Sequence, residues 1–374
     1  MNLPVDQGEM KCQNYSYISC SNKSNSSFLK DVPTPIISDW GFWIKFLSTP
    51  LIVLVGIIGN SLSLMVMKAP SLRNKSYSHF LCALAVFDTF SLLIRQIESI
   101  DEYYVFHSAK PGVFQNFNSL SCKMYNYIAH VITLMSSWLV VLMAVERLIA
   151  VCFPFKNAVL RKQNGALIAI CVLLCIVLLS QSFRFIIIEH LLYDQKFEIW
   201  DCLAGHDFIE LYTSLDIYFF QWALVFVFPV VLISVCNSMV IYQILKVKKD
   251  VNREEEYLTR ADNSGARKKT RSTRMLLILT FTYMLTLLPV FSLTLIVDLS
   301  IKFSNISTAR NVYLTLTPYI DVGVAISLMN YAVNFFIYVL SGKRFRFELK
   351  RLFRRRRRNR PSIKRTATVK STRV

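Results

Sequence analysis

Charged residues are scarce in this sequence. Only 18% of its 374 residues are Asp, Glu, Lys or Arg, whereas 53% are hydrophobic, and the mean hydropathy is +0.40. Soluble domains carry about 25% charged residues, so this deficit argues against a soluble enzyme. The nine cysteines are spread too thinly for a small disulfide scaffold, and an aromatic content of 13% excludes a disordered or collagen-like chain. Composition therefore favours a membrane protein.

Two further signals are missing. Residues 1–30 are polar, so no cleavable signal peptide is expected at Met1. The chain also lacks the internal repeat that marks transporters built from duplicated halves.

Long apolar runs are what the chain does contain. A membrane-spanning helix needs about 20 mostly apolar residues, and backbone groups in lipid must be hydrogen-bonded within their own segment. We therefore predict an all-α membrane protein with a seven-transmembrane helix bundle over residues 44–340. Its spans lie at approximately 44–68, 77–104, 119–152, 165–188, 213–246, 271–299 and 312–340.

Basic residues gather on one side of these spans. The first and third loops carry Lys68, Arg73, Lys75, Lys156, Arg161 and Lys162. The segment after Ser341 holds fifteen Lys and Arg residues against one acid, Glu348. Loops rich in Lys and Arg stay in the cytosol, so residues 1–43 are predicted to lie outside and residues 355–374 inside. The loop 189–212, which has six acidic residues and one lysine, then lies outside.

Sequons and cysteines agree with this orientation. Four N-glycosylation sequons fall on the predicted outer side, at Asn14, Asn22, Asn25 and Asn305. Four cysteines face the same oxidising side, an even number that permits disulfides: Cys12, Cys20, Cys122 and Cys202.

Several polar residues lie at membrane depth. Asp88 is the sharpest case, because an ionisable group inside a bilayer is costly and usually functional. Asn60, Ser136, Asn330 and Asn334 lie at similar depths and could join it in a cluster that holds a small cation or water. The plainer alternative is that the Asn and Ser side chains only hold helices together, at about 0.6 kcal/mol per hydrogen bond.

The cytosolic ends carry further patterns. Glu146 and Arg147 close the third span, and Pro229 and Pro289 permit kinks in the fifth and sixth. Residues 341–354 have apolar positions at helical spacing between basic residues, which predicts a short amphipathic helix on the inner leaflet. The following arginines, 354–358, would bind anionic lipid at about 1 kcal/mol per charge. Nucleic-acid binding is the rival interpretation, and a tail tethered to a membrane favours lipid.

Together these motifs resemble one family over roughly residues 44–353. The pattern is similar to rhodopsin-like (class A) G-protein-coupled receptors, which are multi-pass proteins of the plasma membrane and not enzymes. The matching motifs are Gly59-Asn60, Leu84-Ala-Val-Phe-Asp88, Cys122, Glu146-Arg147-Leu148, Pro229, Pro289 and Asn334-Phe-Phe-Ile-Tyr338.

The resemblance implies roles for individual residues. Cys122 and Cys202 would form the disulfide that holds the second outer loop to the third helix. The family's sodium pocket would comprise Asp88, Ser136, Asn330 and Asn334, with Na⁺ as an allosteric ion and no other cofactor. The G-protein switch would comprise Glu146, Arg147, Pro154 and Tyr338.

Some positions depart from the family pattern. Leu148 replaces a tyrosine, Leu287 a tryptophan, Asn237 a tyrosine and Phe335 a proline. We expect G-protein coupling to remain, with altered basal activity.

The ligand class is narrowed mainly by exclusion. Amine receptors of this family place an aspartate where this chain has Ala129, and opsins need a seventh-helix lysine that residues 313–341 lack. Only residues 1–43 precede the first span, whereas glycoprotein-hormone relatives need a long ectodomain. Biogenic amines, retinal and large protein hormones are therefore disfavoured.

A short, basic, amidated peptide is the preferred ligand, because the acidic outer loop would steer cations and because Asn-Phe-Phe-Ile-Tyr resembles invertebrate RFamide-like receptors. Lipid or nucleotide ligands are the alternative, and a seven-helix channel or transporter is less favoured.

Pocket candidates are Arg95, Glu98, His130, Arg184, Gln221, Asp298 and Asp321, with Asp216 nearby. The other expected partners are heterotrimeric G protein, anionic lipid, and kinases and arrestin-like proteins that act on Ser362, Thr366, Thr368, Ser371 and Thr372.

Overall fold

The computed structural model describes residues 11–12, 20–21, 40–107, 111–152, 163–194, 199–254 and 263–358. Asn14, Asn22, Asn25, Pro154 and the serines and threonines after residue 358 lie outside the described residues.

Seven helices within these residues are long and apolar enough to cross a membrane, as the sequence predicted. They run over Trp40–Met67, Ser76–Val105, Ser119–Cys152, Asn164–Ile187, Glu210–Lys246, Leu277–Phe303 and Ser307–Ala332. The predicted fold class is confirmed.

Within the described residues, seven long helices are followed in the sequence by two shorter ones. They are α1 (Trp40–Met67), α2 (Ser76–Glu102), α3 (Ser119–Cys152), α4 (Gln163–Gln181), α7 (Phe228–Glu254), α8 (Asn263–Phe303), α9 (Ile306–Ala332), α10 (Asn334–Ser341) and α11 (Lys343–Arg358). Short elements join them: the π-helix η1 (Tyr103–His107), η2 (Phe114–Asn116), α5 (Arg184–Ile187), η4 (His206–Phe208), α6 (Ile209–Tyr212) and the π-helix η5 (Thr213–Val227).

Two antiparallel hairpins complete the structure. Strands β3 (Ile188–Asp194) and β4 (Ile199–Ala204) form one within the second outer loop. The other joins β1 (Lys11–Cys12) to β2 (Cys20–Ser21), and its register places Cys12 opposite Cys20. That backbone register is compatible with a disulfide between them, which stays a prediction.

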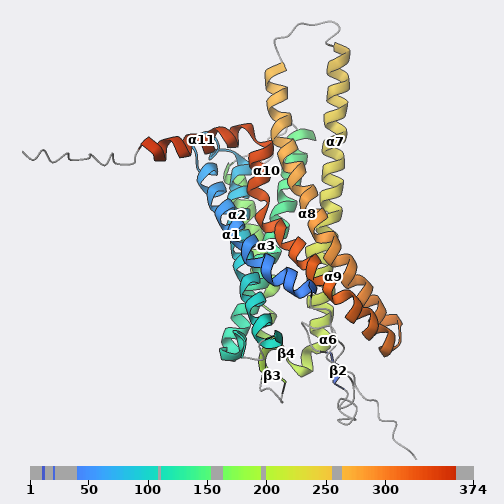
Figure 1. Ribbon diagram of the computed structural model, residues 1–374. Coiled ribbons are helices and arrows are strands. Elements are labelled where there is room, and N and C mark those ends of the chain that lie inside the picture. Colours follow the sequence, from blue (N-terminus) through green and yellow to red (C-terminus); the bar gives the residue numbers. More distant parts are fainter. Residues whose placement is uncertain are drawn as a thin grey trace, which may run out of the picture.

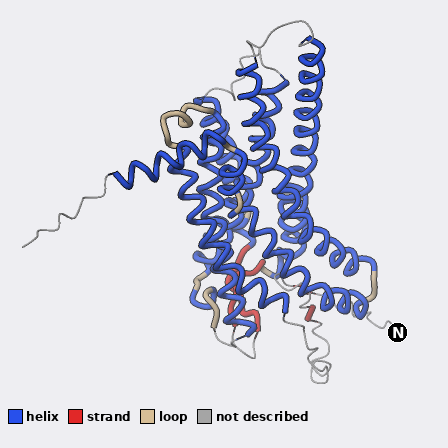
Figure 2. Tube along the Cα trace, turned by 45° about the horizontal axis from the view of Figure 1, so that its top comes forward, coloured by secondary structure: helices blue, strands red, loops and turns tan. Residues whose placement is uncertain are grey.

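The two ends of the bundle differ in what they carry. At one end, α11 lies across the bundle and α7 and α8 project beyond it, whereas β3 and β4 lie at the opposite end (Figures 1 and 2). We call these the α11 end and the hairpin end. They correspond to the sides that the charge pattern predicts to be cytosolic and external. We call the half of the bundle next to the α11 end the inner half and the half next to the hairpin end the outer half.

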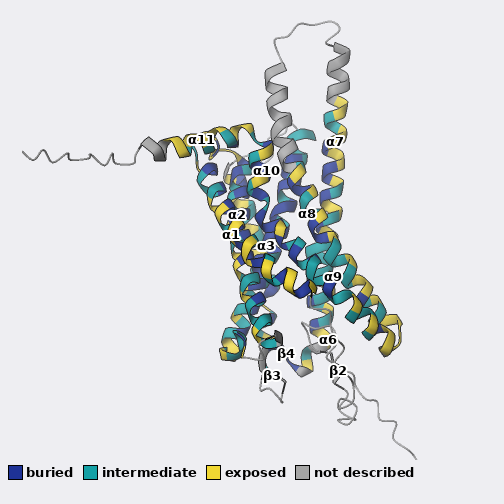
Figure 3. Cartoon of the chain, viewed as in Figure 1, coloured by how far each residue is buried: buried dark blue, intermediate teal, exposed yellow. Residues whose placement is uncertain are grey.

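Helix α3 is the central element. Its apolar window is 67% buried, against 11% to 39% for the other six spans. The surrounding helices carry many exposed positions (Figure 3). Large apolar residues such as Leu47, Leu51 and Leu179 are among the exposed ones, as in lipid-facing helices.

Several spans differ in detail from the prediction, and the fourth is divided into α4 and α5. The seventh begins at Ile306 and is interrupted at Val333, so that α9 and α10 replace one continuous helix. This interruption occurs although Phe335 stands where a proline is usual. The fifth begins with fifteen residues of π-helix, η5, which turn into α-helix immediately before Pro229.

Candidate functional site

The polar residues of the inner half converge on Asp88, which is 1% exposed. Ser136 on α3 donates a hydrogen bond to Asp88 Oδ1 at 2.6 Å, and Asn334 at the start of α10 donates to Oδ2 at 2.6 Å. Asn60 on α1 donates to the Tyr331 carbonyl at 3.1 Å. Asp88 thus joins α2 to α3 and α10, and Asn60 joins α1 to α9. The carboxylate has no basic partner among the described residues.

A disulfide links the hairpin end to the central helix. Cys122, near the start of α3, is bonded to Cys202 on β4, 80 residues along the chain. Both cysteines belong to a small buried cluster with Ile187, Ile188 and Tyr212. The disulfide therefore holds the β3–β4 hairpin over the bundle.

At the α11 end, Glu146 and Arg147 form an ion pair. Arg147 Nε lies 2.7 Å from Glu146 Oε2, both residues are buried, and the guanidinium sits 5.0 Å above the ring of Tyr77 on α2. Tyr338 is also buried and packs against Phe345 of α11, with ring centroids 5.6 Å apart. Arg147 is therefore tied to its own helix and to α2.

A cavity of about 310 Å³ opens within the outer half of the bundle. Four of the predicted pocket residues line it: Arg95, Glu98, His130 and Gln221. Its apolar lining includes Phe220 from η5 and Leu287, Val290 and Phe291 from α8. The last three flank Pro289, so the cavity borders the sixth span beside its proline.

The other three pocket candidates do not line this cavity. Arg184 is fully buried, because its guanidinium binds Asp216, Asn126 and Gln181. Asp321 is occupied by Lys45 of α1 at 2.6 Å, and Glu102 binds the same ammonium at 2.7 Å. Asp298 lies farther toward the end of α8. Polarity in the sequence identified these residues, but it could not show that two of them neutralise a partner.

A sequence match to a known family identifies the class of protein to which this chain belongs. Residues 59–338, about three quarters of the chain, match the sequence profile of the 7 transmembrane receptor (rhodopsin family). The chain belongs to the rhodopsin family of seven-transmembrane receptors. It is therefore a multi-pass membrane receptor and not an enzyme.

Named relatives come from two invertebrates. The FMRFamide receptor of Drosophila melanogaster is 25% identical over 352 residues, which cover 88% of this chain and 57% of the relative. The FMRFamide peptide receptor frpr-18 of Caenorhabditis elegans is 35% identical over 33% of this chain and 29% of its own length. The galanin-like G-protein coupled receptor npr-9 of the same organism is 31% identical over 35% and 28%. The chain thus spans little more than half of the first relative and under a third of the others.

Membership of this family raises the question of a sodium ion at Asp88, and the residues present fit one. Asn60 Oδ1, Ser63 Oγ and Ser91 Oγ are buried and have no hydrogen-bond partner within the described part of the chain, and Ser91 lies one turn from Asp88 on α2. Hard cations take oxygen ligands of this kind. No cluster of three or more His, Cys, Asp or Glu side chains occurs among the described residues, so a site here would combine one carboxylate with neutral oxygens.

Sequence reasoning missed how the fifth span is held. Pro229 has no N–H, so the carbonyls of Leu224 and Val225 lose their π-type and α-type helical partners. Trp138 Nε1 on α3 donates to the Leu224 carbonyl at 3.0 Å, and the Tyr283 hydroxyl on α8 donates to the Val225 carbonyl at 2.7 Å. The proline in the sequence indicates that two carbonyls of the fifth span lack helical donors. No local sequence pattern indicates which side chains donate to them instead.

A second link between the fifth and sixth spans involves a departure from the family pattern. Asn237 donates to Thr280 Oγ1 at 2.8 Å, and both residues are buried. Asn237 therefore joins α7 to α8 at the position where a switch tyrosine is usual.

Proposed function

We propose that this receptor binds a short, basic, amidated neuropeptide and signals through heterotrimeric G proteins. The supporting observation is the outer cavity. Its polar lining residues include Arg95, Glu98, His130 and Gln221, and its other lining residues are mostly apolar. The relatives named as FMRFamide receptors support the same ligand class. An acidic outer loop over the cavity would also raise the encounter rate of a cationic ligand.

The size and lining of the cavity suit one end of such a peptide. A volume of about 310 Å³ is at the lower end of the range for small-ligand sites, about 300 to 1,000 Å³. Glu98 would pair with a basic side chain, and His130 and Gln221 would hydrogen-bond the terminal carboxamide. Phe220 and Phe291 would pack against an apolar or aromatic side chain of the peptide.

Signalling would follow from contacts that favour the open bundle. A ligand that binds more tightly to one conformation shifts the population toward it. The occupant touches Leu287, Val290 and Phe291 around Pro289, so it would swing α8 outward at the α11 end. Arg147 would then leave Glu146 and Tyr77 and meet the carboxyl-terminal helix of the G protein, a helix-in-groove interaction.

The polar core would oppose this change. When bound, a sodium ion at Asp88 supplies the positive charge that the carboxylate lacks. Asp88, Ser136 and Asn334 would then hold α2, α3 and α10 together and favour the closed state. Phosphorylation of the tail by kinases, followed by arrestin-like partners, would end signalling.

A calcium-release screen tests this proposal. Cells that express the chain with a promiscuous G protein would be challenged with a library of amidated neuropeptides. We expect a submicromolar response that disappears in Arg147→Ala, because the arginine would make the G-protein contact, while labelled peptide still binds. Arg73→Ala, which removes an exposed arginine at the same end, is the matched control and should keep the response.

Two results would overturn the proposal. Silence across the library, with receptor at the cell surface, would exclude the peptide class and turn the search to lipids and nucleotides. A full response in Arg147→Ala would exclude the proposed G-protein switch.

A further inference from the structure

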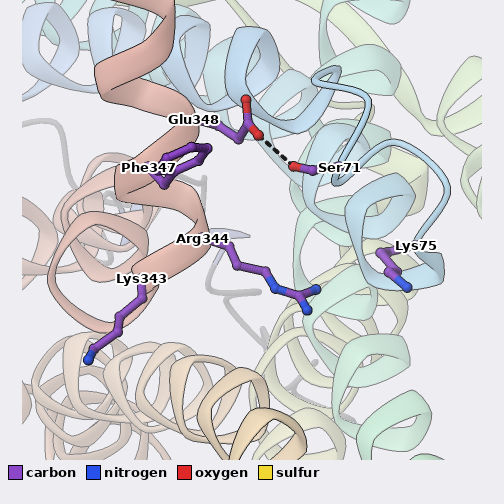
Figure 4. Close-up of a pocket in the computed structure, with 6 residues that line it drawn as sticks. All are labelled: Ser71, Lys75, Lys343, Arg344, Phe347 and Glu348. Atoms are coloured by element: carbon purple, nitrogen blue, oxygen red, sulfur yellow. Dashed lines mark hydrogen bonds between the residues drawn. The ribbon is translucent and has the colours of Figure 1, made fainter.

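A second cavity lies at the α11 end, far from the outer cavity. Its volume is about 470 Å³, and it is formed by the first loop and the start of α11 (Figure 4). The lining residues are Ser71, Lys75, Lys343, Arg344, Phe347 and Glu348. A volume of this size is within the range of small-ligand sites, and none of these residues belongs to the polar core or the outer cavity.

The cavity has an excess of positive charge. It contains three cations and one carboxylate, and that carboxylate is already engaged: Glu348 is 6% exposed and accepts a hydrogen bond from Ser71 Oγ at 2.8 Å. Within the described part of the chain, neither Lys75 nor Lys343 forms a salt bridge. In Figure 4, Arg344 extends from α11 toward the side on which Lys75 lies, and Glu348 turns toward Ser71.

The start of α11 adds to this imbalance. A helix amino terminus is the positive end of the helix dipole and favours acidic residues in its first turn. The first turn of α11 has no acidic residue and begins instead with Lys343 and Arg344. The helix dipole and the side chains therefore reinforce each other, and an anion in the cavity would relieve their repulsion.

Exposed apolar side chains near the cavity indicate which source of anions this surface would meet. Phe347 at the cavity is 66% exposed, and Leu340 on α10 and Phe353 farther along α11 are 77% and 52% exposed. Side chains of this kind on an amphipathic helix enter the acyl boundary of a bilayer. The cavity thus opens where lipid headgroups would lie.

We propose that this cavity binds the phosphorylated headgroup of an anionic membrane lipid. Lys75 and Arg344 contact the phosphate oxygens, and Lys343 lies at the rim. The site is distinct from the arginine run 354–358, whose attraction for anionic lipid needs no cavity. It also adjoins the switch, because Arg344 lies close to the Tyr77 hydroxyl and the Tyr77 ring carries Arg147 at 5.0 Å.

Lipid binding to matched charge variants tests the site. The full chain would be placed in phosphatidylcholine nanodiscs and titrated with fluorescent phosphatidylinositol bisphosphate. Lys75→Gln with Arg344→Gln removes two cavity charges, and Arg73→Gln with Lys350→Gln removes two exposed charges that lie outside the cavity and outside the arginine run. We expect affinity to fall about tenfold more in the cavity variant than in the control.

Each alternative outcome contradicts a stated part of the proposal. If lipid were held only by diffuse electrostatic attraction, both variants would lose the same affinity. Equal losses would therefore contradict a lipid site in the cavity. Since Lys75 and Arg344 are exposed, folding should be retained; if the double variant misfolds, the loop variant Lys75→Gln alone must still bind more weakly than Lys350→Gln.

Two competitors identify the source of the phosphate. Soluble inositol trisphosphate should displace the lipid only at large excess, and displacement at equal concentration would reassign the site to a free phosphorylated ligand. Phosphatidylserine at equal total charge should compete poorly, because its charge is not clustered. Equal competition by phosphatidylserine would overturn the preference for a phosphorylated headgroup.

Discussion

The buried charges of the outer half and the buried carboxylate of Asp88 in the inner half are stabilised in different ways. In the outer half, Arg184 is paired with Asp216, and Lys45 is paired with Glu102 and Asp321. In the inner half, Asp88 accepts hydrogen bonds from two neutral groups, Ser136 and Asn334. Paired charges fix the positions of helices, whereas a lone carboxylate keeps an affinity for a cation. The outer ion pairs therefore fix the helices that they join, whereas Asp88 would remain open to a cation.

Breaking the most deeply buried ion pair should have the largest effect. Asp216→Ala would leave the fully buried Arg184 without its counter-charge, a change that costs about 3 to 5 kcal/mol of stability. We expect a large fall in the unfolding temperature of the purified receptor and in the amount that reaches the cell surface.

The double variant Arg184→Met with Asp216→Leu is the control. Replacing both partners by apolar residues of similar size is often neutral or stabilising, so stability should recover. A single Asp216→Ala variant as stable as the parent would show that the pair does not hold the outer half together.

Removing the lone carboxylate should have an intermediate effect, on regulation. Asp88→Asn keeps the size of the side chain but removes the charge that would attract sodium. Allosteric couplings typically change affinity about 5- to 150-fold, and we expect the effect of sodium on agonist affinity to vanish in this variant. Agonist competition in sodium and in an organic cation at equal ionic strength measures it.

Asp298→Asn provides the comparison with the outer half. It removes a carboxylate far from the polar core, so the sodium effect should persist even if agonist affinity changes. Full sodium sensitivity in Asp88→Asn would sink the sodium hypothesis.

The smallest effect on stability is expected for the partly exposed pair in the outer cavity. Arg95 Nη1 lies 2.6 Å from Glu98 Oε2, and the two side chains are 34% and 19% exposed. Exposed pairs contribute about 0 to 1 kcal/mol, so Arg95→Ala should hardly change the unfolding temperature. It should instead raise the affinity of a basic peptide, because Glu98 loses its competing cation.

The opposite substitution sharpens this test. Glu98→Gln should lower the affinity of a basic peptide by removing its counter-charge, and dose–response curves for the two variants should shift in opposite directions. Weaker activation in Arg95→Ala, with unchanged Glu98→Gln, would favour an anionic ligand such as a nucleotide.

Several features of the molecule were predictable from local sequence. The seven spans follow from apolar runs, because hydropathy is a property of each segment alone. The similar depths of Asn60, Ser136, Asn330 and Asn334 predict a cluster around Asp88, and of these the structure joins Ser136 and Asn334 to that carboxylate by hydrogen bonds. The Cys122–Cys202 disulfide followed from resemblance to the family, and it is present.

Other features depend on how the helices are rotated against one another. The pairing of Lys45 with Asp321 joins residues 276 positions apart, and no local pattern distinguishes it from a pocket residue facing a ligand. The interruption at Val333 likewise occurs without a proline, where Asn334 reaches Asp88.

The sequence by itself determined how many helices cross the membrane, which family they belong to and which end is basic. Those properties depend only on the composition of each segment, so they are the same whatever the arrangement of the helices. Only the tertiary structure decided the partner of each buried polar group: Asp216 for Arg184, Tyr283 for the Val225 carbonyl and Thr280 for Asn237. A hydrogen bond requires donor and acceptor atoms within about 3 Å, and that distance between residues on different helices exists only once the helices have packed.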